Sequence, residues 1–250
     1  MAREARKKSK TGIYHVMLRG ADRRSLFYDD ADNERFLQTL RRAKGESAFQ
    51  LYAFCLMGNH VHLLLKEGEE PLEVIFKRIG VSYVQYYNRK YQLHGHLFQD
   101  RFRSEAVEDD AYFLDVLRYI CRNPVKAGLS GKPFEYPWLG CSGVTEGEEL
   151  LDSLEELTDL KGEVLKRFVS EPSEREHLED TGSKRLTDRE AMERLQGVCG
   201  CREALEIGGW ESEKRDAAVR KALKSGLSIR QLSRLTGLSK AIIEGIARRG

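Results

Sequence analysis

The stretch FQLYAFCLMGNHVHLLLKE, residues 49–67, carries aromatic and aliphatic side chains on both sides of a Met-Gly-Asn segment. This pattern predicts two β-strands, which either form a hairpin or follow one another. Alternate residues of a strand point to the same side, so His60, His62 and Leu64 should share one face. Two imidazoles on one face could grip a single cation, or they could be hydrogen-bonded histidines of the core. A third ligand and a nucleophile elsewhere in the chain would decide between these interpretations.

Strands and helices alternate around this stretch. The residue patterns predict a strand over 11–20, a helix over 29–46, a helix over 71–91, a short strand over 102–109 and a helix over 109–123 that ends at Pro124. The order is strand, helix, strand, strand, helix, strand, helix. It predicts an α+β fold, in which a ferredoxin-like antiparallel sheet carries its helices on one face.

Charge divides the rest of the chain. Basic residues exceed acidic ones by five over residues 1–145 and by six over 211–250, whereas acidic residues are in excess by nine over 146–180. We expect three parts: a first domain over 1–144, an acidic helical linker or subdomain over 145–210, and a DNA-binding region over 211–250. The two basic parts could each meet a polyanion, although solvated helix faces explain the charges equally well.

The last segment, SIRQLSRLTGLSKAIIEGIARRG at residues 228–250, has leucine and isoleucine at helical spacing around a central break. Gly237 can take the left-handed conformation that ends one short helix, and Ser239 can cap the next. The pattern is similar to a helix-turn-helix, whose second helix, at about 240–249, would face DNA with its basic side chains.

A possible third ligand and a possible nucleophile occur together in LRYICRNPVKAG, residues 117–128. Tyr119 and Asn123 are four residues apart, so on a helix they lie on one face, where a phenol and an amide oxygen could approach one metal ion. Both also have ordinary structural roles: Asn123 could end the helix before a proline, and Tyr119 could pack in the core. Tyr112, seven residues earlier on nearly the same face, is the rival nucleophile. Tyr119 is favoured because Asn123 follows it by one turn.

His94 and His96 form a rival pair to His60 and His62. Gly95 between them and their polar flanks indicate a loop, where the two rings need not converge. The strand pair is favoured because the pleat of a strand fixes the direction of both side chains.

Three motifs in this order carry a resemblance to a known family. They are MGNHVHLLL at 57–65, GHLFQDRFRS at 95–104 and YICRNPVKAGL at 119–129. Over roughly residues 10–145, the chain resembles the IS200-like, single-tyrosine HUH transposases, specifically the REP-associated tyrosine transposases. The resemblance implies that His60 and His62 bind a divalent metal, Mg²⁺ or Mn²⁺, with Asn123 as third ligand, and that Tyr119 attacks DNA. It also implies a substrate of folded single-stranded hairpins and a monomer or a homodimer.

The chemistry of these residue types agrees with that reading. A tyrosine hydroxyl that attacks a phosphodiester forms a covalent 5′-phosphotyrosine and releases a 3′-OH, which keeps the bond energy for rejoining the strand. A bound cation would polarise the phosphate and stabilise the developing charge. Imidazole ligands by themselves favour Zn, Cu, Ni or Fe, so the choice of Mg²⁺ or Mn²⁺ rests on the resemblance.

Basic residues that could bind DNA phosphates occur in several segments. They are Arg19, Arg23, Arg24, Lys77, Arg78, Arg89, Arg101 and Arg103 in the first domain, and Lys240 and Arg248 in the last helix. Over residues 76–92 they are interleaved with tyrosines, a combination that favours single-stranded DNA through phosphate pairing and base stacking. Some of these tyrosines must pack against the sheet instead. The arginines of the loops could equally be solvated.

Composition sets the class of protein. The chain has 250 residues, of which 40% are hydrophobic and 33% charged, so it should fold. No stretch approaches the ~18 to 20 apolar residues of a membrane span, and the basic N-terminus lacks the apolar segment of a signal peptide. We therefore expect a protein of the cytoplasm, associated with the nucleoid, and without membrane contacts. Five scattered cysteines fit reduced thiols better than a disulfide framework.

The leading hypothesis is a metal-dependent, single-strand DNA endonuclease and transposase that also binds double-stranded DNA through its C-terminal tail. A non-catalytic DNA-binding regulator with the same fold is the main alternative. A replication or conjugation initiator would need a helicase partner. A metal-dependent hydrolase would form no covalent adduct.

Overall fold

The computed structural model describes residues 7–145, 149–172, 186 and 188–249. They form two compact units, one within residues 1–21 and 26–180 and one within residues 22–25 and 181–250. The boundary falls inside the acidic range 145–210. Its part up to residue 172 packs in the first unit, and α5 (Asp188–Cys199) packs in the second.

A five-stranded sheet forms the centre of the first unit. Its strands are β1 (Ile13–Arg19), β2 (Gln50–Met57), β3 (His60–Lys66), β4 (Arg103–Val107) and β5 (Leu139–Cys141). Their order is β4-β1-β3-β2-β5, and each neighbouring pair is antiparallel. The first four strands, with helices after β1 and β3, have the ferredoxin-like arrangement, so the predicted α+β fold is confirmed. β5, which pairs with the outer edge of β2, was not predicted.

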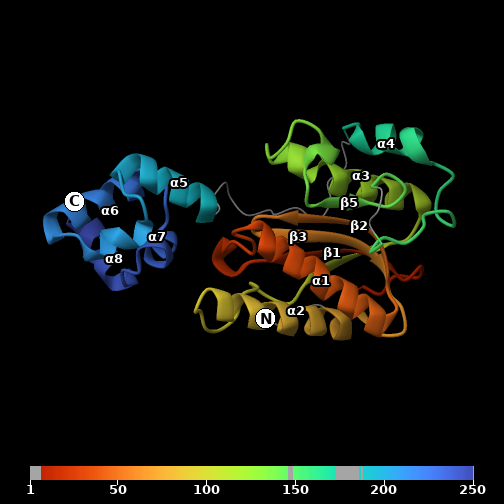
Figure 1. Ribbon diagram of the computed structural model, residues 1–250, viewed down its shortest axis with the longest axis horizontal. Coiled ribbons are helices and arrows are strands. Elements are labelled where there is room, and N and C mark those ends of the chain that lie inside the picture. The colour runs from red at the N-terminus through yellow and green to blue at the C-terminus, as the bar shows by residue number, and fades with distance from the viewer. Residues whose placement is uncertain (1–6, 146–148, 173–185, 187, 250) are drawn as a thin grey trace. The chain divides into compact units, whose positions relative to one another are not determined.

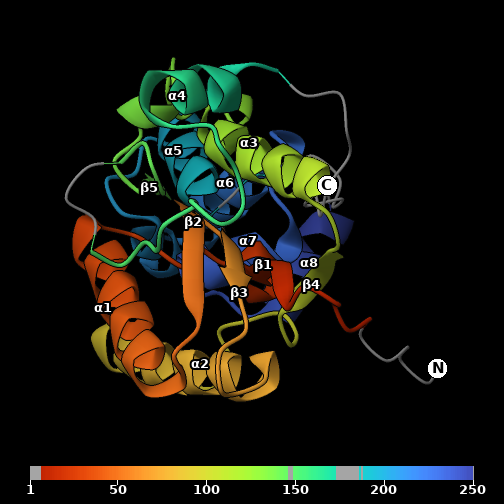
Figure 2. The same cartoon turned by 90° about the vertical axis from the view of Figure 1, so that its right-hand side faces the viewer.

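Helices cover both faces of this sheet, as Figures 1 and 2 show. One face packs against α1 (Asp30–Ser47) and α2 (Leu72–Lys90), and the other against α3 (Asp110–Lys126), beside which α4 (Gly162–Ser170) lies. The sequence predicts helices on one face only. α1 and α2 form that layer, whereas the layer of α3 and α4 on the other face was not predicted. The second layer forms because every residue of β2 after Gln50 is buried, so this strand needs apolar partners on both sides.

The β2–β3 hairpin fixes the direction of the histidine side chains. Met57 pairs with His60, and Gly58 and Asn59 form the turn between them, so the hairpin alternative for this stretch is the one observed. Val61, Leu63 and Leu65 point into the core under α1 and α2, whereas Leu64 joins the core under α3. The alternation of a strand then places His60 and His62 on the same face as Leu64, as the sequence predicts, and the structure shows that α3 covers this face.

α3 extends past the residue where the sequence predicts its end. The side chain of Asp109 accepts a hydrogen bond from the amide of Tyr112 at 2.7 Å and caps the first turn. The helix was predicted to stop at Pro124, which was wrong, because it continues to Lys126. A proline in the last turn removes only one helical hydrogen bond, and buried packing of Ile120, Cys121 and Pro124 holds the remaining turn.

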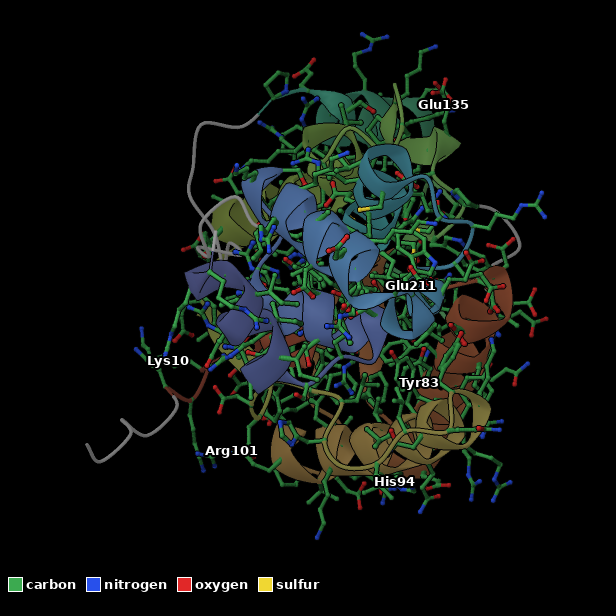
Figure 3. The ribbon with its side chains drawn as sticks, turned by 90° about the vertical axis from the view of Figure 1, so that its left-hand side faces the viewer. Lys10, Tyr83, His94, Arg101, Glu135 and Glu211 are labelled. Carbon is green, nitrogen blue, oxygen red and sulfur yellow. The ribbon has the colours of Figure 1, made fainter. Side chains whose placement is uncertain are left out.

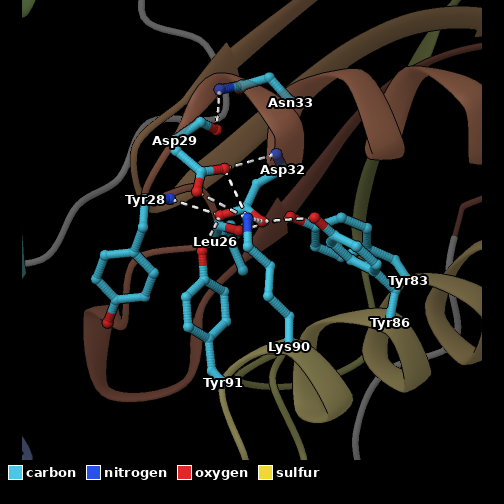
Figure 4. A network of polar contacts seen from close by, with 9 residues as sticks. All are labelled: Leu26, Tyr28, Asp29, Asp32, Asn33, Tyr83, Tyr86, Lys90 and Tyr91. Atoms are coloured by element: carbon cyan, nitrogen blue, oxygen red, sulfur yellow. Dashed lines mark hydrogen bonds and ion pairs between the residues drawn. The ribbon is translucent and has the colours of Figure 1, made fainter.

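A buried carboxylate ties α1 to α2 on the opposite face of the sheet (Figure 4). The Asp32 side chain, with no exposed surface, accepts hydrogen bonds from Lys90 Nζ at 2.7 Å, the Tyr91 hydroxyl at 2.6 Å and the Tyr86 hydroxyl at 3.1 Å. Burial alone would raise the pKa of Asp32, but these donors and the amide of Tyr28 outweigh it and lower that pKa.

The second unit is helical. Around a common apolar core it contains α5, α6 (Ser212–Lys224), α7 (Ile229–Thr236), α8 (Lys240–Arg248) and the 3-10 turn η3 (Ala204–Gly209). Gly237 follows α7 with φ 71°, and the side chain of Ser239 accepts a hydrogen bond from the amide of Ile242 at 3.3 Å. The two short helices and the break between them are therefore as predicted. Lys240 and Arg248 lie exposed on α8.

Candidate active site

The rings of His60 and His62 lie together on the α3 face of the sheet. Their centroids are 5.0 Å apart and their planes meet at 89°. His60 Nδ1 donates to Oδ1 of the buried Asn59 at 2.7 Å, and His62 Nδ1 lies 3.0 Å from Nε2 of His15. Each ring thus uses its Nδ1 inside the protein, which makes Nε2 the nitrogen that a cation would meet.

His15, on β1, is a third histidine of this cluster and was not predicted to be part of the site. Its side chain is fully buried, its ring stacks on that of His62 at 5.2 Å, and its Nδ1 lies 3.9 Å from Glu105 Oε2. The signal available in the sequence was a histidine inside the apolar strand predicted over 11–20. Burial lowers the pKa of His15, against the opposing effect of Glu105. Burial, together with His60 and His15, also holds the pKa of His62 well below its usual range. Both rings are therefore neutral imidazoles near pH 7.

Tyr119 reaches the histidines from α3. Its half-buried ring meets the His62 ring edge-on at 5.5 Å and the His15 ring at 5.7 Å. The ammonium group of Lys126, in the last turn of the same helix, lies 5.7 Å from the centre of the Tyr119 ring. The structure therefore brings together the strand histidines and the helix tyrosine that the sequence singled out separately.

Asn123, the predicted third ligand, is buried one turn after Tyr119. Its Nδ2 donates to the backbone oxygen of Tyr119 at 3.1 Å, a contact within α3, which continues to Lys126 and does not end before Pro124. This bond uses the amide nitrogen, so the amide oxygen is the atom with capacity for a cation.

The residues at this site can be tested for their fit to a divalent cation. Two imidazoles and an amide oxygen are chemically suitable donors. Over the described ranges, no group of three or more His, Cys, Asp and Glu side chains could hold a metal ion, and a set of two histidines and one amide contains only two such residues. The donor set therefore fits a cation held in part by the protein and in part by water or substrate oxygens. All five cysteines are free thiols, as predicted.

The rival residues occupy other positions. His94 and His96 are exposed in the loop after α2, and His94 lies at the outer surface in Figure 3. Tyr112 lies two turns before Tyr119, in the first turn of α3. The ring contacts that the structure shows for His15 and His62 on this helix are with Tyr119.

Two of the predicted DNA-binding arginines share the face of the histidines. Arg19 pairs directly with His60 across β1 and β3, and Arg103 pairs with Met17, the residue of β1 opposite His62. Strand alternation puts both on the α3 side of the sheet. Arg101, just before β4, is exposed and points outward in Figure 3.

Other predicted basic residues lie elsewhere. Lys77, Arg78 and Arg89 line a groove of about 740 Å³ between α1 and α2, on the opposite side of the sheet. Arg78 is held there by Glu70 and Glu46. The tyrosines interleaved with them do not form an exposed stacking surface, because Tyr83 and Tyr87 are buried and Tyr86 and Tyr91 bind Asp32.

The remaining four cations belong to the second unit. Arg23 and Arg24 are half-buried in segment 22–25, and Lys240 and Arg248 are on α8. Nine of the ten predicted DNA-binding residues therefore fall into three groups: those beside the histidines, those on the α1–α2 side of the sheet and those of the second unit. The tenth, Arg101, is exposed just before β4.

Comparisons with known proteins find similarity to transposases over the part of the chain that contains this site. A family model described as IS200-like transposase matches residues 8–123. A protein of Haemophilus influenzae, assigned as a REP-associated tyrosine transposase, is 27% identical over 142 residues, which cover 52% of this chain and 80% of that protein. Among the residues described, no helix is long and apolar enough to cross a membrane.

Two solved structures match part of this chain. One is a REP-associated tyrosine transposase bound to a REP hairpin, with a TM-score of 0.49 and 19% identity, covering 56% of this chain and 82% of that one. The other is a protein from Deinococcus radiodurans assigned as a transposase, with a TM-score of 0.35 and 17% identity, covering 48% and 95% of the two chains.

Proposed function

We propose that this chain, whose residues 8–123 match the family model of the IS200-like transposases, a family of DNA-cleaving enzymes, cleaves and rejoins single-stranded DNA through a covalent tyrosine intermediate. The observation that carries the proposal is the contact between the Tyr119 ring and the His62 ring, with centroids 5.5 Å apart. A nucleophile beside a pair of cation-binding nitrogens is the arrangement that phosphoryl transfer requires.

In the proposed reaction, the Tyr119 hydroxyl loses its proton and its oxygen forms a bond to the scissile phosphorus. The bond from phosphorus to the 3′ oxygen breaks, and that oxygen leaves with a proton as a free 3′-OH. Rejoining is the reverse attack by a 3′-OH on the 5′-phosphotyrosine, so no external energy source is needed.

His60, His62 and Asn123 would hold the divalent cation, Mg²⁺ or Mn²⁺, on which this family generally depends. When bound, that ion withdraws charge from the phosphate oxygens as the new bond forms. Burial, together with His60 and His15, holds the pKa of His62 well below its usual range, so this ring needs no proton loss near pH 7 before it can donate a lone pair.

The proposed substrate is single-stranded DNA next to a folded hairpin. Arg19 and Arg103 support it, because both lie on the face of the histidines, where they could pair with phosphates on either side of the scissile bond. The second unit is proposed to bind double-stranded DNA through α8, whose exposed face carries Lys240 and Arg248. A non-catalytic regulator would keep only this duplex binding.

The experiment is to incubate the protein with labelled hairpin oligonucleotides that carry single-stranded flanks, in Mn²⁺ or Mg²⁺, and to look for a covalent adduct on a denaturing gel. We expect an adduct in the wild type that disappears in Tyr119→Phe and with a chelator, and that persists in Tyr112→Phe. An adduct that persists in Tyr119→Phe would contradict the assigned nucleophile. Duplex binding without any adduct would favour the regulator.

A further inference from the structure

His15 is placed between a carboxylate and a proposed metal ligand. On one side, its Nε2 lies 3.0 Å from His62 Nδ1, and on the other its Nδ1 lies 3.9 Å from Glu105 Oε2. The side chain has no exposed surface, and its ring stacks on that of His62 at an angle of 28°. The three side chains come from three adjacent strands, β4, β1 and β3, and lie on the α3 face, where Glu105 is opposite His15 and His62 is opposite Met17, two residues further along β1.

The direction of the hydrogen bond between His15 and His62 follows from the negative charge of Glu105, which lies beside the other nitrogen of His15. A neutral imidazole carries one proton, on either Nδ1 or Nε2. If His15 kept its proton on Nε2, its Nδ1 lone pair would face the Glu105 carboxylate inside the protein, which is unfavourable. With the proton on Nδ1, His15 points an N–H at that carboxylate, and its Nε2 becomes an acceptor. His62 Nδ1 must then be the donor.

We propose that His15 is a positioning residue that keeps the proton of His62 on Nδ1, so that the lone pair of His62 lies on Nε2, towards the site between His60 and Tyr119. This inference rests on the proposed function, in which His62 holds the cation. Glu105 acts through His15 by fixing its tautomer. The same logic applies to His60, whose Nδ1 donates to the Asn59 amide oxygen, so both rings present the same type of nitrogen.

His15 could act on His62 in two ways, by stacking on its ring or by accepting its Nδ1 hydrogen bond, and substitutions can separate the two. A buried aromatic ring at position 15 could support the His62 ring without accepting its proton. His15→Phe therefore tests the acceptor, and His15→Gln, whose side-chain oxygen can accept a hydrogen bond, tests its replacement.

The first measurement is the tautomer of His62 in the wild-type protein without metal, read from the nitrogen chemical shifts of ¹⁵N-labelled imidazoles. We expect the proton on Nδ1. A proton on Nε2 would overturn the proposal, and this result does not depend on any variant being folded. In His15→Phe, folded as judged by its amide spectrum, we expect His62 to shift towards the Nε2-protonated form. An unchanged Nδ1-protonated form there would equally overturn it.

The second measurement is Mn²⁺ affinity, without DNA, by titration calorimetry or the Mn²⁺ electron paramagnetic resonance signal. Loss of the hydrogen-bond partner of a metal-binding histidine lowers metal affinity by about 10- to 100-fold, and we expect a loss in that range for His15→Phe. His15→Gln should recover at least part of it, and His94→Phe, at an exposed loop position, should match the wild type. Equal affinity in His15→Phe and the wild type would overturn the proposal.

These readouts separate the two hypotheses. If the His62 tautomer and the Mn²⁺ affinity respond to His15 as expected but no DNA adduct forms, the proposed function fails and the positioning role stands. If the adduct forms and neither readout responds, the positioning role fails alone.

Discussion

The ring of Tyr119 meets the ring of His62 edge-on, with planes at 88°, although the two residues come from a helix and a strand 57 positions apart in sequence. The contact exists because α3 packs across β2 and β3, on the face where His62 points. Substitutions of His62 and Tyr119 should therefore separate cation binding from the attack on DNA.

Removal of either strand histidine should abolish tight cation binding. Removing the hydrogen-bond partner of a metal ligand alone lowers metal affinity by about 10- to 100-fold. We therefore expect His60→Ala and His62→Ala, which remove a ligand itself, to lower Mn²⁺ affinity by more than about 100-fold. Tyr119→Phe should bind Mn²⁺ like the wild type, since it removes only the hydroxyl. His94→Ala and His96→Ala are the controls. Unchanged Mn²⁺ binding in His62→Ala, measured by calorimetry, would exclude this pair as the metal site.

Neutralising the buried carboxylate between α1 and α2 should destabilise the protein. In Asp32→Asn the ammonium of Lys90 loses its buried partner, and we expect the free energy of unfolding to fall by about 3 kcal/mol. Asp29→Asn is the matched control. Asp29 also binds Lys90, at 2.7 Å, but its side chain is 53% exposed, and asparagine caps α1 as well as aspartate does. Urea denaturation should show a loss below about 1 kcal/mol for this control.

The same carboxylate predicts a dependence on pH. The pKa of Asp32 is lowered in the folded protein, so its contribution is present above the unfolded pKa of about 3.9 and is lost as pH falls through the lower folded value. The difference in unfolding free energy between the wild type and Asp32→Asn should therefore shrink below about pH 4. A difference that stays constant from pH 7 to pH 2 would contradict the assignment of the charge to Asp32.

The turn after β3 should tolerate only glycine at position 68. A Cβ there would overlap the backbone oxygens of Ser47 and Ala48 at the end of α1. Because backbone cannot move aside as a flexible side chain can, Gly68→Ala should cost about 1 to 3 kcal/mol. Gly45→Ala, within α1 and with open space around it, should instead stabilise by about 0.5 to 1 kcal/mol. Thermal unfolding of both variants checks the contrast.

The cap of α8 should control the order of the proposed DNA-facing helix. Ser239→Ala removes the acceptor for the amide of Ile242 and should cost the helix about 1 kcal/mol. Ser239→Asn should keep the cap. Hydrogen exchange by mass spectrometry should then show faster exchange over residues 240–248 in the alanine variant than in the asparagine variant.

The arginines on the histidine face should matter more for single-stranded DNA than the cations of α2. Each phosphate contact contributes about −0.7 to the slope of log affinity against log salt for a single strand, so Arg103→Ala should lower the magnitude of that slope by about 0.7. Lys77→Ala, on the opposite side of the sheet, should leave it unchanged. Fluorescence anisotropy across a salt series makes the comparison. If Lys77→Ala lowered the salt dependence more than Arg103→Ala, single-stranded DNA would bind in the groove between α1 and α2 instead.

Local patterns were sufficient for β1 to β4 and for α1, α2 and all but the last turn of α3, whereas they did not indicate β5. The alternation in residues 60–66 determined which side chains share a face, because the two-residue period of a strand is independent of its neighbours. The capped helices and the break at Gly237 were equally local. Pro124 misled the prediction of the end of α3, since its cost in the last turn is offset by packing that lies outside the helix itself.

The sequence by itself determined the histidine pair, the tyrosine and the order of elements that carries them. Only the tertiary structure decided that α3 covers the histidine face, that His15 and Glu105 stand behind His62, and that Lys77, Arg78 and Arg89 lie on the other side of the sheet. The physical reason is that periodicity assigns a side chain to one of two faces of its own element, whereas contacts between elements depend on which buried surfaces find a partner.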